Sequence, residues 1–217
     1  MIDFPKSTEF NKKIPKQKFY NKLKISNKLE RQFVKEIDTI YWKNKLSAET
    51  LNVGAGITVK EIEIIEIFLK EKNISENLIE FIDREIPYHI VFILRYEQLA
   101  QIYISFKEDS KNRLGKFKVN SYFKTEWLNY DNLSLEINGL DLDKIYENFI
   151  TQVVEDKSIF ENSEDIKEAV IKSKEKEKLK SYIETLENKI KNEKQFNIQV
   201  KLAKELREMK KQLKEFI

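Results

Sequence analysis

The chain has 217 residues, of which 35% are charged, 41% are hydrophobic and none is cysteine, and its formal net charge is +3. The absence of cysteine excludes disulfides, thiolate nucleophiles and cysteine-ligated zinc or iron–sulfur sites. A single histidine, His89, excludes metal sites built from two or more histidines, and it is the one residue on which a Ser/His/Asp catalytic group would depend.

The apolar runs of the chain are all far shorter than the roughly 20 residues that a membrane-spanning helix needs. The first ten residues, MIDFPKSTEF, lack the apolar core of a signal peptide. Together with the lack of cysteine, these features lead us to expect a cytoplasmic protein with no membrane partner.

The first 24 residues are predicted to form a basic arm that is docked on the following domain. This segment holds seven lysines against two acidic residues, a net charge of +5, whereas residues 25–154 carry a net charge of −4. Its large apolar residues, such as Phe10 and Ile14, are unusual in a disordered arm. We expect five of its lysines to contact DNA phosphates or an acidic partner: Lys6, Lys12, Lys13, Lys16 and Lys18.

Residues 25–155 are predicted to form an α+β domain, with a mainly antiparallel sheet packed against helices. In residues 27–46, the apolar positions Leu29, Phe33, Ile37 and Ile40 recur every three or four residues, which indicates one helix face. Similar patterns predict helices at 73–86 and 142–154. Alternating or continuous apolar runs predict strands at 59–69, 88–96, 100–107, 116–124 and 133–137.

One face of the predicted sheet combines basic and aromatic side chains. Nucleic-acid surfaces use cations for phosphates and aromatic rings for bases. A solvated sheet face with ordinary strand residues is the alternative. The candidate binding residues on this face are Arg95, Tyr103, Lys107, Lys116, Lys118, Tyr122 and Lys124.

Three other features suggest chemistry only weakly. The glycines of the GAGITVK segment lack the spacing of a phosphate-binding loop, which favours an ordinary turn. His89 begins an apolar strand and is expected to be a packed histidine. The acidic residues Glu61, Glu63, Glu66 and Glu85, together with Lys70, would fit a divergent Mg²⁺-dependent nuclease only if their side chains converged on one point.

Residues 163–217 are predicted to form a C-terminal coiled coil. Apolar residues recur there in two runs with heptad spacing, and the two runs are out of phase. The lack of glycine and proline between them favours one long helix with a phase shift over a helical hairpin. The expected association residues are Leu179, Ile183, Leu186, Ile190, Leu202, Leu206, Met209, Leu213 and Phe216.

Several long segments resemble an uncharacterised bacterial domain-of-unknown-function family. They include PKSTEFNKKIPKQKFY, IDREIPYHIVFIL and LENKIKNEKQFNIQVKLAKELREMKKQL, and the resemblance extends over nearly the whole chain. It implies no catalytic residues. Its members resemble proteins encoded beside helicase-type restriction subunits and DNA methyltransferases, which implies an accessory role in a DNA-acting complex.

We therefore expect a non-catalytic accessory subunit of a restriction or antiphage defence system, with no cofactor and no metal site. Its partners would be a second copy or a partner helix at the coiled coil, helicase or methyltransferase subunits, and DNA. The alternatives are the divergent nuclease described above and a purely structural coiled-coil protein that forms oligomers.

Overall fold

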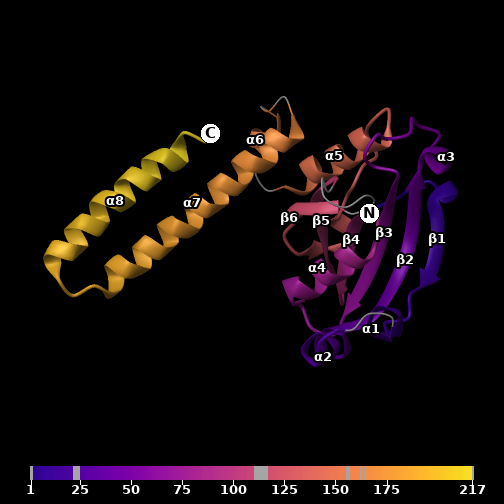
Figure 1. Ribbon diagram of the computed structural model, residues 1–217, viewed down its shortest axis with the longest axis horizontal. Coiled ribbons are helices and arrows are strands. Elements are labelled where there is room, and N and C mark those ends of the chain that lie inside the picture. The colour runs from indigo at the N-terminus through magenta and orange to yellow at the C-terminus, as the bar shows by residue number, and fades with distance from the viewer. Residues whose placement is uncertain are drawn as a thin grey trace. The chain divides into compact units, whose positions relative to one another are not determined.

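A computed structural model of the chain describes residues 2–21, 25–109, 117–154, 157–161, 163 and 165–216. By their contacts these residues divide into two compact units, Met1–Glu155 and Asp156–Ile217 (Figure 1). Each unit is described by itself below.

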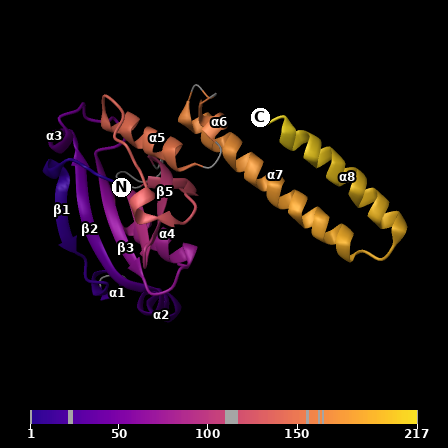
Figure 2. The ribbon, with the colours of Figure 1, turned by 180° about the vertical axis from the view of Figure 1, so that it is seen from behind.

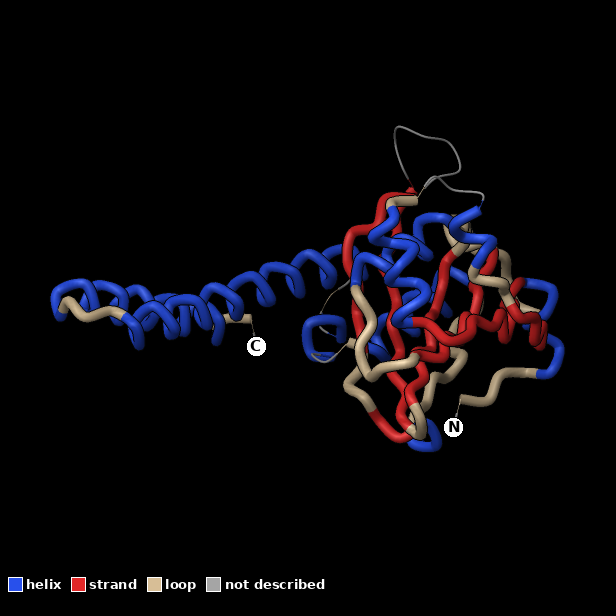
Figure 3. Tube along the Cα trace, turned by 90° about the horizontal axis from the view of Figure 1, so that it is seen from below, coloured by secondary structure: helices blue, strands red, loops and turns tan. Residues whose placement is uncertain are grey.

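The first unit is built on a seven-stranded sheet with the order β1-β2-β3-β4-β5-β6, and β7 also pairs with β5. Figure 3 shows the strands of this sheet in red. Among the described strands, β3 and β4 form the single parallel pair, and the other neighbours are antiparallel. The predicted α+β class with a mainly antiparallel sheet is confirmed. The strands are β1 (Glu9–Lys13), β2 (Ile37–Ser47), β3 (Glu61–Leu69), β4 (His89–Tyr96), β5 (Leu99–Asp109), β6 (Phe117–Lys124) and β7 (Leu128–Asn129).

Helices cover both faces of this sheet (Figures 1 and 2). The neighbouring residues His89 and Ile90 show the division, because side chains alternate along a strand. Ile90 belongs to a core cluster with residues of α2 and α4, whereas His89 contacts Tyr146 of α5. We call these the α4 face and the α5 face. The helices of this unit are η1 (Lys6–Thr8), α1 (Gln17–Asn21), α2 (Asn27–Glu36), α3 (Ala48–Leu51), α4 (Glu76–Glu85), η2 (Tyr130–Asn132) and α5 (Leu142–Val153).

The basic arm contributes an edge strand to the sheet. Residues of β1 pair with β2, and the Phe10 ring packs at a tilt against Trp42 with 4.3 Å between ring centroids. Before the strand, Phe4 packs against Phe149 of α5. The apolar residues that distinguish this segment from a disordered arm therefore hold it against the domain.

The helix predicted over residues 27–46 is wrong in its second half. Helix α2 ends at Glu36, and the chain continues directly as strand β2. The segment after Glu36 reads IDTIYW, which is rich in β-branched and aromatic residues that suit a strand. Pairing with β3 overrides the helical spacing of its apolar residues. The strand predicted over 133–137 is also absent: this segment is an irregular loop that buries Leu133 and Leu135.

The glycine-containing turn before β3 forms a cradle of backbone N–H groups. Three successive amides, those of Ile57, Thr58 and Val59, donate to the carboxylate of Asp143 in α5 at 2.6, 3.1 and 2.7 Å. A Cβ on Gly56 would lie 2.4 Å from the Val59 carbonyl oxygen, so this close approach requires glycine. The cradle thus holds an anion, but the anion is a side chain of the same protein.

The second unit contains α6 (Lys157–Glu161) and a hairpin of two long helices, α7 (Ile166–Asn192) and α8 (Phe196–Lys214). The single long helix favoured from the sequence is therefore wrong. The connector at 193–195 satisfies its own polar groups, because the Glu193 carboxylate accepts from the amides of Lys194 and Gln195 at 2.8 Å each. An ion pair of 2.6 Å between Glu187 and Lys210 links the two helices.

None of the described helices is both long enough and apolar enough to cross a membrane.

Candidate functional site

Four of the five predicted arm lysines are exposed. Lys6 lies in η1, Lys12 and Lys13 lie in β1, and Lys18 lies in α1. The fifth, Lys16, is half-buried and donates to the Ile37 carbonyl at 2.8 Å. Burial lowers the pKa of Lys16, and the nearby Lys70 ammonium lowers it further. The arm therefore offers four exposed cations and one that holds the arm on the sheet.

The structure separates the predicted basic residues of the sheet. Arg95 points to the α5 face, where it forms an ion pair with Glu66 at 2.8 Å and stacks on Tyr130. The β4–β5 register aligns Arg95 with Ala100 and Phe92 with Tyr103, so Tyr103 points to the α4 face. Lys118 is exposed, and Lys116 lies outside the described residues. The predicted residues thus do not share one open surface.

Two more of the predicted residues form a buried network on the α4 face. Lys107 is paired with Asp83 of α4 at 2.7 Å and donates to the Tyr88 carbonyl at the same distance. The Tyr122 hydroxyl also donates to Asp83, at 3.1 Å. Burial lowers the pKa of Lys107, although the Asp83 carboxylate opposes this shift. Because Lys107 is only 4% exposed, its role in this arrangement is to hold α4 on β5.

The acidic residues of the nuclease alternative lie on both faces of the sheet. Glu61 pairs with Lys45 at 2.8 Å, and Glu63 is buried on the same face, whereas Glu66 pairs with Arg95 on the α5 face. Within the described part of the chain, no three His, Asp or Glu residues are placed to hold a metal ion. The geometry therefore gives the nuclease alternative no support.

His89 is packed between two aromatic rings, Phe117 and Tyr146, with centroid distances of 4.7 and 4.6 Å. Burial lowers its pKa to about 3, and the Lys107 ammonium contributes to this shift. The imidazole is therefore neutral at physiological pH, as expected of a packed histidine.

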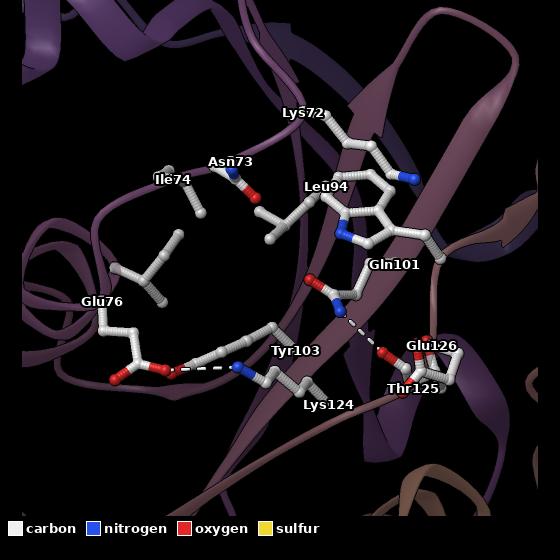
Figure 4. Close-up of a pocket in the computed structure, with 12 residues that line it drawn as sticks. Lys72, Asn73, Ile74, Glu76, Leu94, Gln101, Tyr103, Lys124, Thr125 and Glu126 are labelled. Carbon is white, nitrogen blue, oxygen red and sulfur yellow. Dashed lines mark hydrogen bonds and ion pairs between the residues drawn. The ribbon is translucent and has the colours of Figure 1, made fainter.

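The strongest candidate for a binding site is a pocket of about 260 Å³ on the α4 face, shown in Figure 4. It lies between the loop that follows β3, the strands β4 and β5, and the segment that follows β6. We call it the 124–127 pocket. Two of the predicted binding residues, Tyr103 and Lys124, line it. The other lining residues are Lys72, Asn73, Ile74, Glu76, Ile79, Leu94, Gln101, Thr125, Glu126 and Trp127.

Local hydrogen bonds fix the position of the segment that closes the pocket. The Thr125 hydroxyl accepts from the Ile102 amide at 3.1 Å, and the Thr125 amide donates to the Ile102 carbonyl at 3.0 Å. Gln101 donates from Nε2 to the Thr125 carbonyl at 2.6 Å. The half-buried Trp127 packs against the core cluster. These contacts hold the walls of the pocket in place without a ligand.

Several polar groups in the 124–127 pocket are left available. Lys124 pairs with Glu76 at 3.2 Å, but Lys72 has no ion-pair partner among the residues that the structure describes. In the same part of the chain, neither the Tyr103 hydroxyl, the Trp127 indole N–H nor the Asn73 side chain has a hydrogen-bond partner. Burial raises the pKa of Tyr103, so its hydroxyl remains protonated and can donate.

Most residues of this pocket were missed by sequence reasoning. They come from four stretches that lie between positions 72 and 127, and none of these stretches carries a recognisable motif. One local signal in the sequence could have pointed to the pocket. Thr125, Glu126 and Trp127 directly follow a predicted strand, and polar and aromatic residues in that position lie at the edge of a sheet.

The predicted association residues of the tail are distributed over α7 and α8. Ile183 and Leu186 of α7 are buried, and Leu179 and Ile190 are half-buried. No residue of α8 is buried in the described structure. The predicted residues of the C-terminal run are all half-buried: Leu202, Leu206, Met209, Leu213 and Phe216.

Comparisons with known proteins identify a family but no activity. No curated protein and no solved structure matches the chain. The family described as "Domain of unknown function (DUF4391)" matches residues 2–213, which is almost the full length. The chain therefore belongs to this family, in agreement with the resemblance of its sequence to an uncharacterised family.

Proposed function

We propose that the chain is a non-catalytic accessory subunit that binds a partner protein through its α7–α8 hairpin. The observation that carries this proposal is the incomplete burial of the hairpin. A stripe of large apolar residues runs along α8, yet none of them is fully covered in the part of the chain that the structure describes. Most helices gain their stability from packing an apolar face, so this stripe has room for further helices.

The charge of the hairpin favours an acidic partner. Residues 166–216 contain 15 basic and 9 acidic side chains, a net charge of +6. A groove on α8 has Ala203 and Leu206 at its apolar part, and it is lined by Arg207, Glu208, Lys210, Lys211 and Lys214. An amphipathic helix with acidic flanks would bury the apolar part and pair with these cations. A second copy would bring a second +6 charge to the same place.

We further propose that the partner belongs to a DNA-acting complex in the cytoplasm, in a restriction or antiphage defence system. This part of the proposal is supported by the resemblance to proteins encoded beside helicase-type subunits and DNA methyltransferases. The exposed lysines of the arm are suited to the phosphate backbone of DNA.

Complex formation tests the hairpin proposal. The chain would be mixed with helicase-type and methyltransferase subunits of a restriction system, the partners proposed here, and assembly measured by sedimentation velocity. We expect the double substitution Leu206→Asp and Leu213→Asp to weaken the complex at least tenfold. Gln212→Asp, an exposed position on the same helix, is the matched control and should leave it unchanged. Equal assembly by all three proteins, or no assembly with either subunit, would contradict the proposal.

DNA binding by the arm is tested separately, by measuring affinity for a DNA duplex at several salt concentrations. Replacing Lys6, Lys12, Lys13 and Lys18 by Gln should lower the affinity and flatten its salt dependence, because fewer counterions are released. Replacing four exposed lysines of α7 by Gln gives a control with the same change in net charge. A salt dependence that the arm substitutions leave unaltered would refute the DNA part of the proposal.

A further inference from the structure

We propose that the 124–127 pocket binds a single unpaired nucleobase, either of a free nucleotide or of a single-stranded nucleic acid. This inference rests on the proposed association with nucleic acid, and it assigns a separate site to it. The pocket uses other residues than the arm and the hairpin, so an experiment can refute one of the three proposals and leave the others standing.

The size of the pocket limits what can enter. Its volume of about 260 Å³ lies just below the range of about 300–1,000 Å³ that is usual for pockets of drug-sized ligands. A large cofactor would therefore not fit, whereas a single ring system with part of its sugar is suited to this space.

The walls of the pocket supply surfaces for a flat ring. Trp127 packs on the core cluster, which holds its indole in place, and Ile74, Ile79 and Leu94 supply aliphatic surface. Stacking on an aromatic side chain stabilises a bound base and tolerates every base, since each base has a π-face.

The polar groups of the pocket match the edge of a base. Gln101 is held through its Nε2, which leaves its Oε1 as an oriented acceptor. Asn73, the Tyr103 hydroxyl and the Trp127 indole add donors and an acceptor that have no partner among the described residues. Base edges present donors and acceptors side by side, and side-chain amides pair with them. An aromatic side chain of a protein partner would fill the apolar part but leave these polar groups without hydrogen-bond partners, which is unfavourable.

The charges around the pocket predict how binding depends on salt. Two lysines, Lys72 and Lys124, are accompanied by two glutamates, Glu76 and Glu126, and Figure 4 shows the lysines reaching the pocket from different elements. Because Glu76 already pairs with Lys124, Lys72 is the cation that remains for a phosphate. Binding at this site should therefore be driven by the base and depend only weakly on salt, unlike binding by the arm.

Fluorescence titration of the full chain tests this inference, since the two tryptophans are Trp42 and Trp127. The probes are the four nucleoside monophosphates, single-stranded dA20 and dT20, and the dA20·dT20 duplex. We expect a monophosphate or a single strand to quench the fluorescence, with the duplex at least tenfold weaker. Binding of the monophosphates identifies a free nucleotide as the ligand, and binding of the strands alone identifies a base within a strand.

Two substitutions connect binding to the pocket. Trp127→Ala and Gln101→Leu should each lower the affinity for the bound probe at least tenfold, measured for Trp127→Ala by calorimetry. Gln98→Leu, at an exposed position in the β4–β5 turn, is the matched control and should not change it. Far-ultraviolet circular dichroism verifies that every variant is folded. If Trp127→Ala does not fold, Gln101→Leu still tests the pocket, because it retains the Trp127 indole.

The inference is overturned if no monophosphate or single strand binds, or if the two pocket variants bind as tightly as the unaltered chain. Equal affinity for single strand and duplex would also overturn it. The outcomes for the arm are separate. If the arm variant loses duplex binding but retains pocket binding, the result supports both the arm proposal and the pocket proposal. Pocket binding without any duplex binding supports the pocket and refutes the arm.

Discussion

At the scale of single residues, the most unusual group is the buried carboxyl of Glu63. It is 1% exposed, and neither of its oxygens has a hydrogen-bond partner among the described residues. Burial raises its pKa to about 7, an effect that the nearby Trp42 indole partly offsets. A carboxyl in this state retains its proton in the folded protein at pH values where the unfolded chain has lost it.

The Glu63 carboxyl predicts a stability that decreases as the pH rises. Between the unfolded pKa of 4.5 and the folded value of about 7, the folded state binds one more proton than the unfolded state, so stability falls with pH. The loss amounts to about 3 kcal/mol in total and stays constant above pH 7. Glu63→Gln, which cannot ionise, should therefore stabilise the protein at pH 8 but not at pH 4.5. Urea unfolding followed by tryptophan fluorescence measures this; an equal effect at both pH values would contradict it.

His89 produces the opposite pH dependence, because its folded pKa of about 3 lies below the ordinary value of 6.5. Below pH 6.5 the unfolded chain binds a proton that the folded protein does not, so stability falls with acid. Between pH 4.5 and 6.5 the opposite contributions of Glu63 and His89 to the pH dependence of stability cancel. In Glu63→Gln, the His89 contribution should emerge as a loss of about 1.4 kcal/mol per pH unit below 6.5. If the free energy of unfolding fell equally with acid in Glu63→Gln and in the unaltered chain, this compensation would be ruled out.

The carboxylate of Asp143 links two distant segments through three backbone amides. Its removal leaves those amides without their partner, and hydrogen bonds to a charged group contribute about 1.5–3 kcal/mol each. Asp143→Ala should therefore lower the free energy of unfolding by about 2–4 kcal/mol, and Gly56→Ala should also destabilise because its Cβ would clash with the Val59 carbonyl. The exposed Ala55→Ser is the control. Stability unchanged in Asp143→Ala, measured by the same urea unfolding, would show that the cradle is not structural.

At the scale of elements, the Asp83–Lys107 pair determines how α4 is held against β5. Lys107→Met would leave a buried carboxylate without its cation, which typically costs about 3–5 kcal/mol. The double variant Lys107→Met and Asp83→Leu should recover part of that loss, because it removes both charges. Urea unfolding of the two single variants and the double variant gives the coupling energy. Simple additivity of the single effects would contradict an ion pair that acts as a unit.

The elements also show where sequence patterns succeed and fail. The strands at β3, β4, β5 and β6 and the helices at α4 and α5 could be predicted, since their apolar runs agree with local propensity. The helical spacing of Ile37 and Ile40 was misleading, because the sheet buries both residues through pairing with β3. In the tail, both seams were visible, but the break at 193–195 has no glycine or proline to reveal it.

At the scale of the whole molecule, the candidate site depends on pairing that no local pattern contains. Tyr103 and Lys124 could be identified as candidates, and the β5–β6 register does place them opposite each other. Arg95, in contrast, lies on the other face because the β4–β5 register aligns it with Ala100. The residues Lys72, Asn73 and Trp127 join the pocket through the crossover and the loop after β6, which the sequence alone does not predict.

We propose that a partner binds on α8, and hydrogen–deuterium exchange of the full chain is the sharpest test of this proposal. Free in solution, α8 should exchange far faster than β3 and β4, because its described residues include none that is buried. Saturation with the proposed partner, a helicase-type or methyltransferase subunit, should slow exchange at least tenfold over residues 202–213, while β3 and β4 remain unchanged. Exchange in α8 that is already as slow as in the sheet, or that no partner alters, would contradict the claim.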